Sequence, residues 1–385
     1  MKTKFEQSKE NSHILLFGIG FALPFIFAKL IPYFCSGDIE TFRLWADCLA
    51  QYGRQIYLAC NMPPDHSLPN YPTVGLLASA GIIHIIKSIT GLTNGDAIYH
   101  AFRLYLAVFD GLNFFLFITI ARMMHFRNPL LIGFLLLLIP SNLAGGSIWG
   151  QTDNIALSLC LVTSIALIKS WSGSQDDYEG SKWKPIAWLI LAVVSLPFFL
   201  LVKQLSIFSV PYFLVLFTVT ILRFWQHWQS KGLLWIGVAL GVFGVVFFSL
   251  DHILAVPDQF LGSSYYYVWA GSGSENGKLI SGNGFNIWIF LGRDMGSSAL
   301  TPFSLLSNKD FDLSVGPYYL GILLYLGWIM FLLGTSVGIV RQLFRERIAT
   351  LSPIDPAIIA VLFLYHGLSY LGFNVLLTGT HERYL

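Results

Sequence analysis

Residues 185–202 read PIAWLILAVVSLPFFLLV, a run of eighteen positions without a charged side chain. An α-helix rises 1.5 Å per residue, so this run covers most of the ~30 Å hydrocarbon core of a bilayer. Comparable apolar stretches occur at 14–34, 101–121, 129–145, 154–171, 206–222, 233–250, 317–340 and 355–376. The pattern predicts about nine transmembrane helices, of which the one at 129–145 is short and nearly upright.

The composition supports a membrane protein and argues against other classes. Of the 385 residues, 11% are charged and 55% are hydrophobic, whereas soluble domains carry about 25% charged residues. The 32 Phe residues argue against disorder. A net charge of +2 without a dominant basic patch argues against nucleic-acid binding. The predicted fold class is an all-α polytopic membrane protein that forms a single domain over 1–385.

Positive charge predicts the topology, because cytoplasmic loops are enriched in Lys and Arg. Residues 72–92 are also apolar, and we expect them to lie along the interface. Thirteen of the 23 basic residues then share one side: Lys2, Lys4, Lys9, Arg122, Arg127, Lys169, Lys182, Lys184, Arg223, Lys231, Arg341, Arg345 and Arg347. That side is predicted to be cytoplasmic and to include the N-terminus. The other side receives two large loops, 35–100 and 251–316, in which interfacial helices are expected.

The cysteines and the sequons give weaker indications. Cys35, Cys48 and Cys60 share the first outer loop, where one disulfide bond is possible and reduced thiols are the alternative. The first apolar stretch is too long for the core of a signal peptide, so it is expected to remain as the first helix. The outer loops contain no N-x-[ST] sequon, which favours a bacterial plasma membrane.

The first outer loop begins with two carboxylates, Asp38 and Glu40. A carboxylate at the membrane surface could act as a general base toward a hydroxyl group, or hold a divalent cation. The alternative is a structural role at a helix start, because Phe42 and Trp45 follow with helical spacing. The sequence leaves these interpretations open.

Further polar residues follow on the predicted outer side, and each has two interpretations. Asp153 either starts a helix or contacts a sugar hydroxyl, and Lys203 either extends to the interface or pairs with a phosphate. His381 and Arg383 carry donors suited to phosphate oxygens, or belong to an ordinary charged tail. Arg103 and Asp110 share a helix face and are expected to be structural. The histidines lack metal-ligand spacing, so no metal site is predicted.

Taken in chain order, these motifs resemble those of the integral-membrane glycosyltransferases with the GT-C fold. The chain is similar to dolichyl-phosphate-glucose-dependent glucosyltransferases and to bacterial proteins like the second mannosyltransferase of GPI-anchor assembly. The matching motifs are Gly37-Asp38-Ile39-Glu40 with Arg43 and Trp45, Tyr71-Pro72, Arg103 with Asp110, Trp149-Gly150-Gln151-Thr152-Asp153, Lys203-Gln204, Asn286-Ile287-Trp288 and His381-Glu382-Arg383-Tyr384.

The resemblance implies an inverting transfer of a hexose, mannose or glucose, at the outer membrane face. The donor would be a polyprenyl-phosphate sugar, and the acceptor a lipid-linked or envelope glycan. Asp38 would be the catalytic base, with Glu40 beside it. The donor phosphate would lie near Lys203, His381 and Arg383. The expected substrate-binding residues are Arg43, Trp45, Tyr71, Trp149, Gln151, Asp153, Asn286 and Trp288. No cofactor, metal or nucleic acid is expected.

Two departures from the family pattern leave other functions open. The chain has Tyr71-Pro72-Thr73 where relatives have Tyr-Pro-Pro, and it stops at Leu385, whereas relatives usually continue with further helices. A truncated chain is one explanation of the second departure. The alternatives are a transporter or flippase of lipid-linked sugars, and a non-catalytic GT-C relative. The lack of an internal repeat counts against a transporter.

Overall fold

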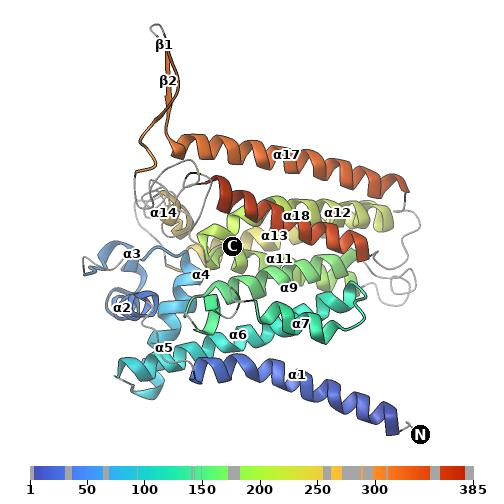
Figure 1. The fold of residues 1–385 in the computed structure, drawn as a ribbon, viewed down its shortest axis with the longest axis horizontal. Helices are drawn as coiled ribbons and strands as arrows, with labels where there is room; N and C mark the ends of the chain where they lie inside the picture. Colours follow the sequence, from blue (N-terminus) through green and yellow to red (C-terminus); the bar gives the residue numbers. More distant parts are fainter. Residues whose placement is uncertain are drawn as a thin grey trace.

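The computed structural model describes residues 4–30, 37–63, 69–92, 94–139, 142, 144–148, 150–171, 183–254, 262–270, 288, 298–308, 311–346 and 356–377. Within these residues the regular structure is helical, apart from one two-stranded hairpin. The long helices lie alongside one another in a bundle (Figure 1). The helical class predicted from the sequence is therefore confirmed, and the arrangement is compatible with a polytopic membrane protein.

Nine of the helices formed by the described residues run along the bundle. They are α1 (Lys4–Leu30), α6 (Gly95–Met123), α7 (Pro129–Leu137), α9 (Asp153–Trp171), α11 (Trp183–Val202), α12 (Val210–Trp228), α13 (Ser230–Asp251), α17 (Pro317–Glu346) and α18 (Pro356–Leu376). Among the described residues, 7 helices are long and apolar enough to cross a membrane. Six of these coincide with predicted stretches, and the seventh is Thr73–Thr90.

The predicted span at 129–145 is wrong in its extent. α7 has only 9 residues, and Leu138 and Ile139 form a turn after it. Pro140 follows in the sequence, and the residue before a proline is disfavoured in the helical conformation. The short helix is consistent with that restriction.

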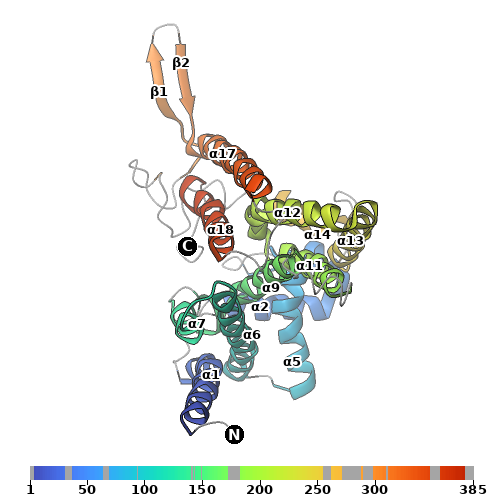
Figure 2. The same ribbon diagram turned by 90° about the vertical axis from the view of Figure 1, so that its right-hand side faces the viewer.

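The segment Thr73–Thr90 lies across one end of the bundle. It consists of α4 (Thr73–Leu76), η2 (Leu77–Gly81) and α5 (Ile82–Thr90). α5 runs across the direction of α6 in Figure 1, and Figure 2 shows α5 side-on while α6 is foreshortened. It packs against α2 and α6. This direction is compatible with the interfacial helix expected at 72–92.

Other parts of the expected outer loops gather at the same end. These are α2 (Gly37–Tyr52), η1 (Gly53–Gln55), α3 (Ile56–Ala59) and α14 (Ser264–Ala270). The N-terminal end of α1 lies at the opposite end (Figure 1). The described segments that the charge pattern assigns to one side therefore share one end of the molecule.

The hairpin was not anticipated. β1 (Phe303–Asn308) pairs antiparallel with β2 (Phe311–Val315), and the two strands project away from the bundle just before α17 (Figures 1 and 2). The sequence of β2, FDLSV, alternates apolar and polar residues with a period of two, which is typical of a strand. That signal is short and was overlooked beside the longer apolar stretches.

Two apolar clusters form most of the core. One lies between the long helices and includes Ala166, Val193 and Leu216, each fully buried. The other lies under the end that carries α2 and α4, and contains Phe42 and Trp45 among its largest side chains. The second cluster supports the polar residues described next.

Candidate functional site

The N-terminus of α2 presents the two carboxylates of the first outer loop. Asp38 and Glu40 lie in its first turn, where the helix macrodipole stabilises negative charge. Both side chains are partly exposed. Seven residues separate Asp38 from Trp45, so these two residues share one face of α2, roughly 10 Å apart along its axis. Asp38 is thus placed at the N-terminal end of a helix face that continues to the buried Trp45.

Glu40 and Arg43 are engaged with each other and with neighbouring helices. Arg43 Nε donates to Glu40 Oε2 at 3.0 Å and its Nη2 donates to Oε1. The hydroxyl of Tyr99 on α6 also donates to Glu40 Oε2. Arg43 Nη1 lies 3.5 Å from Asp47 Oδ2. The contact of Tyr99 joins α2 to α6, whereas the contacts of Arg43 with Glu40 and Asp47 lie within α2.

Trp45 and Tyr71 belong to an aromatic cluster beneath this surface. Their ring centroids lie 5.6 Å apart, and Phe42 lies 5.4 Å from Trp45 and 5.7 Å from Tyr71. The side chain of Trp45 is only 1% exposed. The buried indole of Trp45 therefore packs against the ring of Tyr71.

Tyr71 connects the first outer loop to two distant parts of the chain. Its hydroxyl donates to Gln151 Oε1 at 3.0 Å, and Lys203 Nζ lies 5.9 Å from its ring centroid. Lys203 also forms an ion pair with Asp153, the first residue of α9. The structure therefore brings together five of the predicted site residues: Trp45, Tyr71, Gln151, Asp153 and Lys203.

The turn that carries Gln151 and Asp153 is held by α6. Arg103 Nε donates to the Ser147 carbonyl at 2.9 Å, and the Ser147 amide donates to Asp110 Oδ2 at 3.0 Å. Asn154 Nδ2 donates to Asp110 Oδ1 at 3.0 Å. A Cβ atom at Gly146 would come within 2.6 Å of Asp110 Oδ1, so glycine permits this approach. These contacts fit the structural role expected for Arg103 and Asp110.

Several polar atoms in this turn are buried without a hydrogen-bond partner in the part of the chain that the structure describes. They are Ser147 Oγ, Gln151 Nε2, Thr152 Oγ1, Asp153 Oδ2 and Asn154 Oδ1. A buried polar group left unsatisfied costs about 1–3 kcal/mol. Their concentration in one short segment indicates a place where a polar ligand or water would be bound.

A buried carboxylate that the sequence analysis missed fixes α4 and α14 to this end of the bundle. Asp251, 1% exposed, accepts from Ser264 Oγ at 2.7 Å and from the Tyr265 amide at 2.8 Å. Thr73 Oγ1 donates to Ser264 Oγ at 2.8 Å. The available signal was an acidic residue directly after the apolar stretch 233–250.

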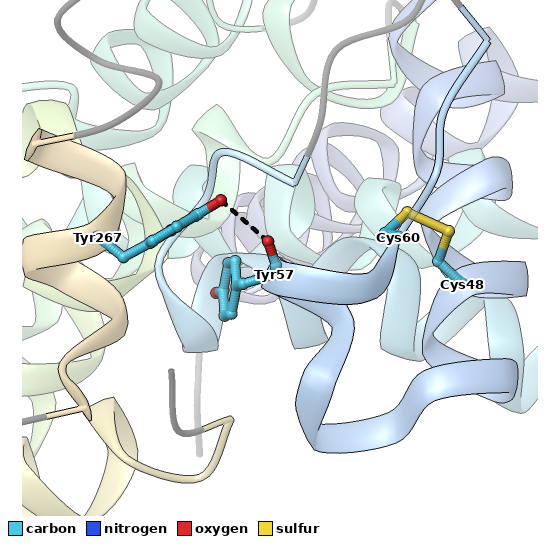
Figure 3. The surroundings of a disulfide bond; sticks show 4 residues. All are labelled: Cys48, Tyr57, Cys60 and Tyr267. Atoms are coloured by element: carbon cyan, nitrogen blue, oxygen red, sulfur yellow. Dashed lines mark hydrogen bonds between the residues drawn. A yellow bond between two sulfur atoms is a disulfide. The ribbon is translucent and has the colours of Figure 1, made fainter. Parts of the chain in front are cut away.

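Tyr57 and Tyr267 join α3 to its surroundings (Figure 3). The Tyr57 hydroxyl donates to the Tyr71 carbonyl at 2.7 Å, and the Tyr267 hydroxyl donates to the Tyr57 carbonyl at 2.9 Å. Burial raises the pKa of Tyr57 well above its ordinary value. Tyr71 is thus positioned through its backbone as well as its side chain.

A disulfide bond links two segments within the predicted first outer loop. Cys48 in α2 bonds to Cys60 after α3, with their Cα atoms 5.4 Å apart (Figure 3). Of the three cysteines considered in this loop, this pair is the one the structure joins, and Cys35 lies outside the described residues. The bond keeps α2 next to the segment that leads to Tyr71.

Of the remaining predicted site residues, the structure describes Trp288 alone. Trp288 is 1% exposed and its indole N–H donates to the Leu376 carbonyl at 2.9 Å. Trp149, Asn286, His381 and Arg383 lie outside the described residues. Within the described part, no group of three or more His, Cys, Asp or Glu side chains is arranged to hold a metal ion.

Comparisons with known proteins do not assign the chain to a family. No protein-family model matches the chain, and no match was found among curated proteins or solved structures.

Proposed function

We propose that this protein is an inverting glycosyltransferase that transfers a hexose from a polyprenyl-phosphate sugar to a lipid-linked or envelope glycan. One observation carries the proposal. Trp45 of α2, Tyr71, the turn at Gln151–Asp153 and Lys203 are far apart in the sequence, yet contacts join them into one cluster in an apolar helical bundle. That arrangement suits a substrate with a lipid tail in the bilayer and a polar head at its surface.

Each residue has a defined role in the proposed reaction. Asp38 removes the proton of an acceptor hydroxyl as its oxygen attacks the anomeric carbon, and displacement from the opposite side inverts the configuration. Lys203 stabilises the charge that develops on the departing phosphate. Gln151 and Asp153 offer a buried amide donor and a carboxylate acceptor for sugar hydroxyls. His381 and Arg383 are proposed to assist at the phosphate.

The disulfide bond supports a site on the non-cytoplasmic side. Disulfides persist in oxidising compartments such as the bacterial periplasm and are rare in the cytosol. Cys48 and Cys60 belong to the same buried apolar cluster as Tyr71, whose ring lies 5.9 Å from Lys203 Nζ. We therefore propose that the end of the bundle that carries α2 faces outward and that the basic end faces the cytoplasm.

The proposal is tested in membranes that contain the full chain. Radiolabelled polyprenyl-phosphate-glucose or polyprenyl-phosphate-mannose is supplied, and loss of label from the donor lipid is followed. Asp38→Asn should slow the transfer by at least about 100-fold, the usual contribution of a general base. Asp96→Asn is the matched control, because Asp96 is also an acidic residue in the first turn of a helix, α6.

The outcome distinguishes the functions considered. Asp38-dependent loss of label from one donor would support the transferase and identify its sugar. Near-normal turnover in Asp38→Asn would rule out Asp38 as the base. No transfer from either donor, with folded protein, would instead favour a transporter of lipid-linked sugars or a non-catalytic relative.

A further inference from the structure

Lys203 is buried and is paired with the partly exposed Asp153, so the cation proposed to receive the donor phosphate already has an internal counterion. Lys203 is 6% exposed, and its ammonium group contacts the Asp153 carboxylate. An ammonium group neutralised by an internal carboxylate attracts an external anion less strongly than one without that partner. An anion that binds at Lys203 must therefore compete with Asp153.

The carboxylate of Asp153 can move away from Lys203 because the first turn of α9 offers it another favourable position. Asp153 is the first residue of α9, where the helix macrodipole stabilises a negative charge. Thr152 occupies the capping position, since its carbonyl accepts from the Ile155 and Ala156 amides. Its hydroxyl nevertheless makes no hydrogen bond within the described residues. The first turn of α9 thus lacks the side-chain cap that a carboxylate could supply.

A second observation points to a ligand at this position. Asp153 Oδ2 and Gln151 Nε2 are both buried and have no hydrogen-bond partner in the described part of the chain. Gln151 itself is fully buried, and its other terminal atom accepts from Tyr71. One acceptor, on the ion-paired Asp153, and one donor, on Gln151, are thus left without a hydrogen-bond partner in the described part of the chain.

The position of Lys203 favours a phosphate that belongs to a lipid. Lys203 directly follows Val202, the last residue of the apolar helix α11, so its backbone lies at the boundary of a candidate membrane span. A phosphate attached to a polyprenyl chain would be presented at this depth, whereas free phosphate remains in water.

We propose that Asp153 is an internal counterion that occupies Lys203 until the phosphate of a polyprenyl lipid replaces it. On replacement the carboxylate turns to the first turn of α9. The identification of the lipid rests on the proposed glycosyl transfer, but the exchange of one anion for another does not. The carboxylate therefore lowers the affinity for the phosphate and keeps the lysine neutralised between binding events.

The experiment measures binding to the full chain in nanodiscs of phosphatidylcholine. Polyprenyl monophosphate is the probe, and inorganic phosphate at the same concentration is the second arm. Asp153→Asn should bind polyprenyl monophosphate at least about tenfold more tightly than the wild type, because the competing charge is gone. Lys203→Gln should lose the binding.

Thermal unfolding independently tests whether the lipid phosphate replaces Asp153 at Lys203. Removal of the Asp153 carboxylate takes this counterion away from the buried ammonium group of Lys203. Asp153→Asn should therefore unfold about 5 °C lower than the wild type without the probe, and should regain most of that difference when polyprenyl monophosphate is added. The double variant Asp153→Asn/Lys203→Met should gain no stability from the probe.

A matched control is available in the pair formed by Asp47 and Lys87. It has the same chemistry, but its side chains are 48% and 28% exposed. Asp47→Asn should leave the affinity for polyprenyl monophosphate unchanged.

Three results would overturn the proposal. Equal or weaker binding by Asp153→Asn would show that Asp153 assists the anion instead of competing with it. Equal binding of inorganic phosphate would exclude the lipid as the specific ligand. If Asp153→Asn does not fold even with the probe, hydrogen exchange in the wild type decides, and unchanged exchange at 151–156 on adding polyprenyl monophosphate would exclude the movement.

Failure of the inference and failure of the proposed function give different results. Asp38-dependent transfer without tighter binding by Asp153→Asn removes only the counterion role. Tighter binding without any transfer removes the enzymatic function and leaves a regulated site for a lipid phosphate.

Discussion

The indole N–H of Trp288 donates a hydrogen bond of 2.9 Å to the carbonyl oxygen of Leu376, the last residue of α18. The last carbonyls of a helix have no partner within the helix, so the indole satisfies one of them. α17 closes the same junction, since a Cβ atom at Gly321 would come within 2.7 Å of the Leu376 oxygen. Trp288 thus fixes the end of the helix that precedes His381 and Arg383 in the sequence.

Trp288→Phe should lower the free energy of unfolding by about 1–3 kcal/mol, because a partly buried carbonyl at the end of a helix loses its donor. Trp328→Phe is the matched control. Trp328 donates in the same way from α17 to the Leu368 carbonyl, at 3.0 Å, but that carbonyl lies inside the helix and has an intrahelical partner. Chemical unfolding should show a smaller loss for Trp328→Phe, and an equal loss would contradict the capping role.

Gly75→Ala should destabilise the protein by about 1–3 kcal/mol and reduce the activity. A Cβ atom at Gly75 would lie 1.9 Å from the Val202 carbonyl oxygen, and overpacking of this kind costs energy or displaces the backbone. Displacement of Val202 would move the adjacent Lys203. Gly237→Ala in α13 meets nothing within 4 Å and should be neutral or slightly stabilising. Parallel thermal unfolding and donor-turnover measurements would check both variants.

Cys48 and Cys60 should resist maleimide labelling in intact cells until a reductant is added. Replacing both by Ser should cost about 2–4 kcal/mol, the usual contribution of a disulfide bond. The free thiol of Cys160 is buried and should label only after unfolding, so it serves as an internal control. Labelling of the Cys48 and Cys60 thiols without reductant would argue against an oxidising environment at this end.

Stability above pH 10 should depend on Tyr57. Burial holds its pKa in the folded protein above the ordinary value of 10.0, so the folded state retains a proton that the unfolded state releases. The resulting stabilisation is complete below pH 10 and is lost at about 1.4 kcal/mol per pH unit as the pH rises further. Tyr57→Phe should lower stability at neutral pH, yet make the decline above pH 10 shallower than in the wild type. Tyr266→Phe, on an exposed side chain of α14, should leave the slope unchanged.

Hexose transfer should continue in EDTA. Both oxygens of Glu40 already accept hydrogen bonds, from Arg43 and from Tyr99, so Glu40 is poorly placed to join Asp38 as a cation ligand. Loss of transfer in EDTA and its recovery with Mg²⁺ or Mn²⁺ would instead assign a metal-binding role to these carboxylates.

The sequence predicted those elements whose signal is a long apolar stretch. Residues 185–202 are an example, because eighteen uncharged positions allow few structures other than a span. The interfacial position expected for 72–92 came from charge, since hydropathy alone does not distinguish a helix that crosses from one that lies flat, and by length and composition Thr73–Thr90 could also cross. The hairpin at 303–315 and the true length of α7 depend on a few residues each, so long-window patterns did not reveal them.

The sequence singled out several residues that the structure brings together, but it did not predict their contacts. Tyr71, Gln151, Asp153 and Lys203 were each singled out, yet no pattern in the sequence pairs residues 50 or 80 positions apart. The burial of Trp45 and Trp288 was also not predicted. In a sequence, a tryptophan that binds a sugar cannot be told from one that packs against a neighbouring side chain. Such distinctions depend on tertiary packing.

The orientation of α5 has a consequence for the bilayer that surrounds the protein. α5 exposes Ile85 and Ile89 on one face, 49% and 80% respectively, and buries Ile83. A helix lying flat with exposed isoleucines occupies area among the head groups of one leaflet only, which makes the molecule wider in that leaflet than in the other. With α5 in the interfacial position expected from the sequence, the protein would be wedge-shaped in the bilayer, and it should partition toward membranes whose curvature or small head groups relieve the lateral pressure in that leaflet.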